Sequence, residues 1–163
     1  MRQRANKLYA AVMHSPIGAL GLRLTDDHLT HIDMLGAARQ TLPRKGLAAE
    51  CVSQLRSYFQ SPSFRFDVPI WLEGTPHQLC VWQALQAIEC GATLSYGELA
   101  GKLGSGPRAV GNACRRNPLP IIVPCHRVIA ANGPGGYAGA VKGAILNRKL
   151  WLLQHEAGAR TDI

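Results

Sequence analysis

The chain of 163 residues is long enough for one ordinary domain or two small ones, which excludes a large multidomain machine. Hydrophobic residues make up 47% and charged residues 17% of the sequence, which favours a globular protein over a disordered, collagen-like or coiled-coil chain. The net charge is +8, with nine basic and two acidic residues in 101–163, which indicates a polyanion-binding surface or, alternatively, a solubilising charge bias.

The first third of the chain has the pattern of a strand meander followed by a helix. Three strands separated by turn residues are predicted over 7–13, 19–24 and 29–35. Apolar residues at helical spacing then predict a helix over 46–60, and a further strand is expected over 64–72. These elements predict a small antiparallel sheet with one helix.

A break at Glu73-Gly74-Thr75-Pro76 separates this part from a mainly helical one. We therefore expect an N-terminal α/β domain over 1–73 and a C-terminal domain over 74–163. Thr75 is a predicted N-cap, and Pro76 would begin a helix that runs toward Gly91. Its predicted apolar face consists of Leu79, Trp82, Leu85 and Ile88.

Two short helices joined by a glycine turn are predicted next. Ser95 and Glu98 have the spacing of a capping box and would open a helix that ends at Leu103. After the turn over 104–106, Pro107 would begin a second helix that runs to about Arg116. This arrangement is typical of a helix-turn-helix motif.

The second of these helices has a cationic face. Its polar side chains share one side, and Val110 and Cys114 lie on the other. The polar set is Arg108, Asn112, Arg115 and Arg116, and small residues at Ala109, Gly111 and Ala113 would let the backbone approach a narrow groove. A bundle helix with a solvated cationic face explains the same spacing equally well.

The five cysteines are an odd number without a CxxC pair, so neither a disulfide framework nor a zinc ribbon is predicted. The N-terminal apolar stretch is too short for a signal peptide, and no apolar run is long enough to cross a membrane. Together with reduced thiols, these features predict a soluble cytoplasmic protein. We expect no metal and no cofactor.

The residues that carry chemistry follow a buried apolar run over 119–124. Cys125, His126 and Arg127 stand together, and nearby cations or imidazole lower a thiol pKa and make the thiolate a nucleophile. A structural cysteine is the competing interpretation. Adjacent side chains of a strand point to opposite faces, so a turn or a water must join Cys125 to His126. Glu156 is preferred to Asp162 as the acid that orients the imidazole, although its spacing taken alone favours a helix-surface acid.

Several motifs together resemble the O6-alkylguanine-DNA alkyltransferase family, whose members are methylated-DNA–protein-cysteine methyltransferases. The matching stretches, in the family's order, are Ser95 to Ala100, Arg108 to Gly111, Asn117-Pro118, Pro124 to Val128, Gly136 to Gly139 and Trp151 to Glu156. The resemblance covers residues 75–158, and its Pro-Cys-His-Arg-Val core is very specific. The N-terminal part matches only in its strand-then-helix layout.

The resemblance implies an α+β fold, with a ribonuclease-H-like N-terminal domain and a C-terminal domain that contains a winged helix-turn-helix. It also implies direct DNA repair without a cofactor. A methyltransferase of this kind is a monomer that acts once. It binds double-stranded DNA from the minor groove and flips the damaged base out of the duplex. It then moves the alkyl group of O6-alkylguanine, or of O4-alkylthymine, irreversibly to its own cysteine.

The resemblance also assigns roles to particular residues. Cys125 would accept the alkyl group, His126 would take its proton through a water, and Glu156 would orient His126. Tyr96 would donate a hydrogen bond to guanine N3, and Asn117 would tie the helix-turn-helix to the active-site loop. Arg108 would fill the gap left by the flipped base; the other DNA-binding candidates are Ala109, Gly111, Asn112, Ala113, Arg115 and Arg116. The base pocket would include Tyr96, Arg115, Val128, Tyr137 and Ala138, with the carbonyls of Cys125 and Val128 reading the exocyclic amine.

The chain departs from the family pattern at three places. The turn over 105–107 is about two residues short, Asn112 replaces a small residue, and residues 141–147 resemble an insertion after Ala140. Three other functions remain open: a damage sensor without transfer activity, a cysteine hydrolase or redox sensor, and a transcription regulator.

Overall fold

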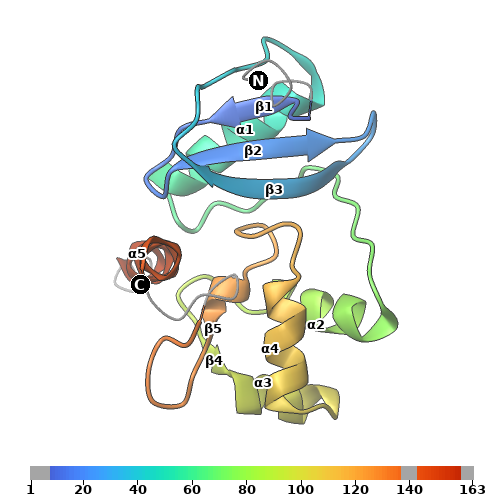
Figure 1. Ribbon diagram of the computed structural model, residues 1–163, viewed down its shortest axis with the longest axis vertical. Coiled ribbons are helices and arrows are strands. Elements are labelled where there is room, and N and C mark those ends of the chain that lie inside the picture. The colour runs from blue at the N-terminus through green and yellow to red at the C-terminus, as the bar shows by residue number, and fades with distance from the viewer. Residues whose placement is uncertain (1–7, 137–142, 159–163) are drawn as a thin grey trace. The chain divides into compact units, whose positions relative to one another are not determined.

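In the computed structural model, which describes residues 8–136 and 143–158, the chain divides into two units, residues 1–72 and 73–163. The first unit holds a three-stranded antiparallel sheet in the order β1-β2-β3 and one helix, α1 (Figure 1). The bounds are Ala11–Met13 for β1, Ala19–Leu24 for β2, Leu29–Gly36 for β3 and Gly46–Gln60 for α1. The predicted meander and helix are therefore confirmed.

The core of the first unit lies between the sheet and α1. Leu20, Leu22 and Leu29 are fully buried on the strands, and Leu55 and Tyr58 are buried on the helix. Removal of these apolar surfaces from water is the main stabilising contribution to a unit of this size.

The strand predicted over 64–72 does not form. A single parallel bridge joins Leu29 to Ile70 instead. Pro69 has no N–H to give to a strand ladder, and the N–H of Asp67 donates to the Gln54 side chain on α1 at 3.0 Å. Pairing with β3 is therefore limited to two bonds at Leu29, whose N–H donates to the Pro69 carbonyl and whose carbonyl accepts from the Trp71 N–H.

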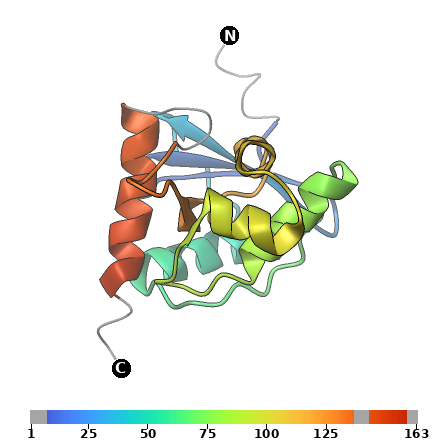
Figure 2. The same cartoon turned by 90° about the horizontal axis from the view of Figure 1, so that it is seen from below.

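The second unit is mainly helical, and a two-residue parallel ladder lies within it. Its elements are α2 (Pro76–Gln86), β4 (Leu94–Ser95), α3 (Tyr96–Leu103), α4 (Pro107–Arg115), a 3-10 helix (Cys125–Arg127), β5 (Val128–Ile129) and α5 (Ala144–Ala157). β4 pairs with β5, so the start of α3 lies beside the segment that follows Cys125. Figure 2 views α4 almost along its axis, with α3 lying across it.

The predicted helix starts are confirmed by their capping bonds. The Thr75 hydroxyl accepts from the N–H of Gln78 at 3.1 Å, and the Ser95 hydroxyl accepts from the N–H of Glu98 at 3.0 Å. Helix α2 ends at Gln86 rather than near Gly91, where the sequence predicted its end. Its predicted apolar face is wrong at Leu79, which is 38% exposed, because Val81 turns inward with Trp82 and Leu85.

Two of the sequence departures have a simple structural outcome. Gly104 ends α3 in the left-handed conformation with φ +61°, which lets the short turn close before Pro107 begins α4. Residues 144–147, part of the stretch that resembles an insertion, form the first turn of α5. Gly143 is the N-cap residue of α5, and residues 141–142 of this stretch lie outside the described residues, as does Ala140.

Candidate functional site

Helix α4 presents a cationic surface to solvent. Arg108, Asn112, Arg115 and Arg116 are exposed, whereas Val110 and Cys114 are buried, as the helical spacing predicts. The small residue Ala109 is exposed and Gly111 is partly exposed.

Ala113 does not belong to this surface. Its side chain is 2% exposed, and its carbonyl accepts a hydrogen bond from the indole N–H of the buried Trp82 at 2.9 Å. The prediction that Ala113 faces DNA is therefore wrong, because this position packs α4 against α2.

Asn117 links the end of α4 to the segment that leads to Cys125. Its side-chain amide donates to the carbonyl of Val123 at 2.7 Å, and its side-chain oxygen accepts from the N–H of Leu119 at 3.0 Å. Between these contacts lies Ile121, a buried β-branched residue with φ +77°. Such a conformation is strained for isoleucine, and strain of this kind persists only where the surrounding contacts enforce it.

The three reactive residues form a 3-10 helix, which supplies the turn that the sequence required between Cys125 and His126. Cys125 is 6% exposed and His126 is fully buried. The N–H of Cys125 donates to the carbonyl of Val123 at 2.8 Å, which fixes the backbone at the thiol. The side chains of Cys125 and His126 therefore project from a helical turn and not from an extended strand.

Glu156 on α5 binds the side chains of the two residues that follow Cys125. Its Oε1 lies 2.7 Å from His126 Nε2, and Arg127 Nε and Nη2 donate to its two oxygens at 2.9 Å each. His126 Nδ1 is buried without a hydrogen-bond partner among the described residues. Glu156 is 1% exposed, so the helix-surface interpretation is wrong.

The charge state of this group follows from burial and from these bonds. Burial by itself raises the pKa of Glu156, but hydrogen bonds from His126 and Arg127 reverse this and lower it to about 2. Burial lowers the pKa of His126, and this effect outweighs the neighbouring Glu156 carboxylate because Arg127 already neutralises that carboxylate. At neutral pH the group is therefore a neutral imidazole that donates from Nε2 to a carboxylate paired with arginine.

The resting thiol of Cys125 is protonated. Burial raises its pKa, and a hydrogen bond with the Asn117 side chain and the charge of Lys149 lower it only in part. His126 and Arg127, which were expected to lower the thiol pKa, are not among the groups that do so. Arg127 is turned toward Glu156 and the carbonyl of Ile88, and the cation that acts on the sulfur is Lys149.

Lys149 was missed in the sequence, although it has a clear position in the structure. Its side chain is fully buried, and Nζ donates to the carbonyls of Val128 at 2.7 Å and Gly136 at 2.9 Å. The spacing of Lys149, Leu152 and Glu156 at offsets of zero, three and seven was the signal that could have revealed it. These three residues share one helix face, and all three are buried.

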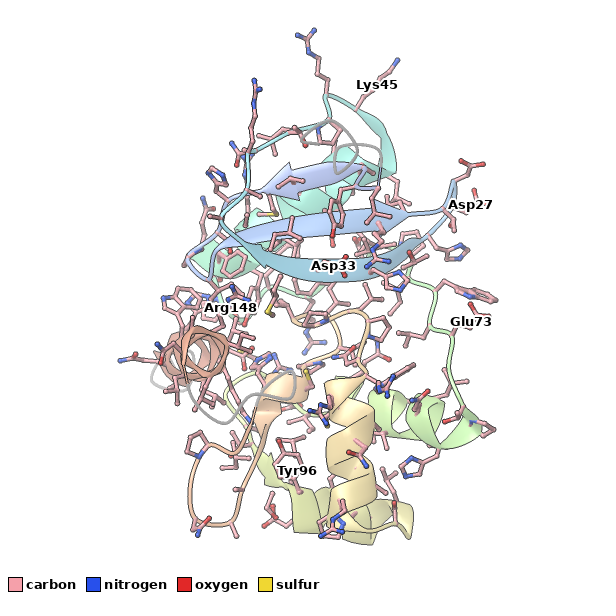
Figure 3. The ribbon with its side chains drawn as sticks, in the orientation of Figure 1. Asp27, Asp33, Lys45, Glu73, Tyr96 and Arg148 are labelled. Atoms are coloured by element: carbon pink, nitrogen blue, oxygen red, sulfur yellow. The ribbon has the colours of Figure 1, made fainter. Side chains whose placement is uncertain are left out.

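Tyr96 occupies the space between α4 and the loop that follows β5 (Figure 3). A Cβ placed on Gly111 would lie 3.9 Å from its ring, and one placed on Gly135 would lie 3.0 Å away. Its hydroxyl lies 3.5 Å from the carbonyl of Gly136. Burial raises the pKa of Tyr96 to about 12, so the hydroxyl keeps its proton and can donate it in a hydrogen bond.

The carbonyls predicted to read the base already have partners. That of Cys125 accepts from the N–H of Val128, and that of Val128 accepts from Lys149. Each oxygen retains a second lone pair. Tyr137 and Ala138, the other predicted pocket residues, lie outside the described residues.

Within residues 8–136 and 143–158, no cluster of three or more His, Cys, Asp or Glu side chains could hold a metal ion. In the same part of the chain, no helix is both long and apolar enough to cross a membrane.

Comparison with known proteins assigns both units of the chain. Residues 8–72 match the ribonuclease-like domain of 6-O-methylguanine DNA methyltransferase, and residues 76–158 match the DNA binding domain of the same family. A methylated-DNA–protein-cysteine methyltransferase of Mycobacterium leprae is 45% identical over 157 residues, which cover 91% of this chain and 92% of the relative.

Solved structures agree with this assignment. The Mycobacterium tuberculosis O6-methylguanine methyltransferase has a TM-score of 0.75 and 40% identity, covering 90% of this chain and 91% of the other. The M. tuberculosis OGT in complex with DNA has a TM-score of 0.74 and 41% identity over the same shares. The chain belongs to the 6-O-methylguanine DNA methyltransferase family, and the predicted family and α+β fold class are confirmed.

Proposed function

We propose that this chain repairs DNA directly, by moving the alkyl group of an O6-alkylguanine to the Sγ atom of Cys125, once per molecule. The observation that carries the proposal is the union, in one unit, of the Cys125–His126–Glu156 arrangement with the exposed cationic face of α4. Asn117 joins the two parts through its bond to Val123. Family membership and the names of the relatives support the same reaction.

The reaction begins with removal of the thiol proton. His126 Nε2 is engaged by Glu156, so Nδ1 is the ring atom that can accept this proton, through a bridging water. The resulting imidazolium would be stabilised by the Glu156 carboxylate, which already carries its negative charge. Because both the thiol and the imidazole are neutral at rest, the nucleophile is produced when it is needed and is protected before that.

The displacement itself exchanges one bond for another. The sulfur forms a bond to the alkyl carbon while the bond from that carbon to guanine O6 breaks, and the electron pair stays on the base. A hydrogen bond from the Tyr96 hydroxyl to guanine N3 would reduce the charge on the leaving base, which takes up one proton overall. The products are a thioether on Cys125 and an unmodified guanine. We assign the rest of the base pocket to Val128, Arg115, Tyr137 and Ala138.

DNA is the partner of this chain, and we propose that α4 enters its minor groove. Phosphate contacts that tolerate any sequence should dominate, since damage occurs in every context. Arg108 would fill the gap left by the flipped base, and the exposed residues Ala109, Gly111, Asn112, Arg115 and Arg116 would line the contact. One chain carries all of these groups, so a monomer suffices. A bacterial protein that acts on chromosomal DNA would work in the cytoplasm, at the nucleoid.

A stoichiometric transfer assay tests the proposal. Duplex DNA with one O6-methylguanine is given in excess, and the methyl groups moved per chain are counted. We expect one per chain and then no further reaction. The Cys125→Ala variant should bind the duplex and transfer nothing, whereas Cys114→Ala should transfer normally. Tight binding by the wild-type chain without any transfer would support the damage-sensor alternative and overturn the proposal.

A further inference from the structure

Ser105, in the short turn between α3 and α4, is bound to a third helix as well. Its N–H donates to the carbonyl of Ala100 on α3 at 2.9 Å. Its hydroxyl oxygen lies 2.9 Å from Nε2 of His77 on α2, 28 residues earlier in the chain. The next residue, Gly106, accepts from the N–H of Val110 on α4 at 3.0 Å. Ser105 is therefore the point at which α2, α3 and α4 are joined.

The backbone around Ser105 is weakly restrained by its own residues. Glycines stand on both sides of it, and a Cβ on Gly104 or Gly106 would meet nothing within 4 Å. Gly106 is also the N-cap of α4 and makes no side-chain capping bond. Because glycine restricts the backbone less than any other residue, a turn of this composition gains order from contacts with its surroundings. The His77 side chain supplies such a contact.

Helix α2 holds α4 at both ends. Trp82 donates its indole N–H to the carbonyl of Ala113, near the last turn of α4, at 2.9 Å, and His77 contacts Ser105 just before the first turn. Trp82 is 2% exposed, so its attachment is part of the core. A helix attached at one end can still tilt about that end, whereas a second attachment fixes its direction. The exposed contact at Ser105 is this second attachment.

We propose that His77 is a positioning residue for base flipping, which holds Ser105 and thereby fixes the start of α4 and the side chain of Arg108. This inference rests on the transfer proposed above. Arg108 is the second residue of α4 and follows Ser105 by three positions. A shift of the turn is therefore passed on to Arg108, and a shift of about 1 Å in a positioning group is costly. The Cys125 segment lies beyond the other end of α4 and should not be affected.

A double-mutant cycle on duplex DNA tests the contact. Single-turnover transfer from O6-methylguanine duplex is measured for His77→Ala, Ser105→Ala and the double variant. We expect each single variant to be about fivefold slower than the wild-type chain, as for the loss of one hydrogen bond. The double variant should be no slower than either single one, because both remove the same contact. Losses that multiply, or wild-type rates in the single variants, would overturn the proposal.

The multiplying result would support the competing explanation, in which the exposed imidazole of His77 binds a DNA phosphate by itself. Two further rates connect the contact to Arg108. Reaction with free O6-benzylguanine should be unchanged in His77→Ala, because a free base needs no flipping. In a chain that already carries Arg108→Ala, His77→Ala should slow duplex repair no further. A loss in either case would show that His77 acts through another group.

Conservative variants separate the contact from a general effect of substitution. His77→Gln keeps a polar atom near the position of Nε2, and Ser105→Thr keeps the hydroxyl, so both should stay within about twofold of the wild-type duplex rate. Gln83→Ala, which changes an exposed polar residue of the same helix, is the matched control and should have the wild-type rate. Rates in His77→Gln and Ser105→Thr as low as those of the alanine variants would contradict the inference.

Hydrogen exchange tests the contact without DNA. The amide of Val110 reports on the first turn of α4, and the amide of Arg116 reports on its other end. We expect exchange at Val110 to be about fivefold faster in His77→Ala and Ser105→Ala, with Arg116 unchanged. An unchanged rate at Val110 would contradict the inference and leave the proposed transfer intact. A wild-type chain without transfer would contradict the proposed function, and Val110 would still decide whether His77 holds the turn.

Discussion

Gly135 approaches the ring of Tyr96 so closely that a Cβ at this position would lie 3.0 Å from Tyr96 Cε2. The same Cβ would lie 3.2 Å from the backbone nitrogen of Ala130, so the loop cannot easily retreat. Gly135 also has φ +74°, where a side chain adds strain. The loop after β5 and the tyrosine proposed to bind the base are therefore fitted to each other.

Gly135→Ala should displace Tyr96 and slow alkyl transfer by about tenfold or more, since misplacement of a positioning group costs this much. The measurement is the single-turnover rate on O6-methylguanine duplex. Gly133→Ala is the matched control from the same loop, because a Cβ there meets nothing within 4 Å. Equal rates for the two variants would show that the contact with Tyr96 is unimportant.

Tyr96→Phe should slow the chemical step while leaving the affinity for DNA nearly unchanged. The ring would still fill the space between Gly111 and Gly135, but the hydroxyl that we assign to guanine N3 would be gone. Transfer rates and binding isotherms measured side by side separate the two effects. A wild-type rate would remove Tyr96 from the mechanism.

Arg108→Ala should impair repair of duplex DNA far more than reaction with free O6-benzylguanine. A free base needs no flipping, whereas extrusion from the duplex costs a few kcal/mol that an inserted side chain helps to offset. A loss of about 1.4 kcal/mol would already reduce the duplex rate tenfold. The ratio of the two rates is the quantity to measure, and equal losses on both substrates would contradict the assigned role.

The acid stability of the second unit should depend on Glu156. Its pKa is about 2 in the folded chain against 4.5 as the reference value, so its contribution is complete above pH 4.5 and is lost as the pH falls toward 2. That loss is on the order of 3 kcal/mol. Glu156→Gln should be less stable at neutral pH, because it leaves Arg127 and His126 without their carboxylate.

The same variant should therefore lose less additional stability on acidification than the wild-type chain does. Denaturant unfolding at several pH values below neutrality measures this difference. Glu89→Gln, which changes an exposed acid in the same unit, is the matched control and should follow the wild-type curve. Parallel pH curves for Glu156→Gln and the wild-type chain would show that Glu156 is not held in its charged form.

Local patterns predicted much of the second unit, because its signals lie within a few residues of each other. The capping residues Thr75 and Ser95 and the exposed face of α4 all follow from short-range spacing. The turn at Cys125 was also predictable, since adjacent strand residues cannot face one another.

Long-range contacts explain what the sequence left out. The pairing of Arg127 with Glu156 spans 29 residues, and it turns a residue expected to activate the thiol into a partner of the carboxylate. Lys149 donates to the Val128 carbonyl, just after the thiol segment, because α5 packs beside the 3-10 helix. The burial of Ala113 likewise depends on Trp82, which no helical pattern of α4 reveals.

The most direct test of the account is the intact mass of the protein after reaction with O6-methylguanine DNA, followed by peptide mapping. We predict a gain of a single CH2 unit per chain, located on the peptide that contains Cys125. An unchanged mass, or a methyl group found on Cys114 instead, would contradict the assignment of Cys125 as the acceptor.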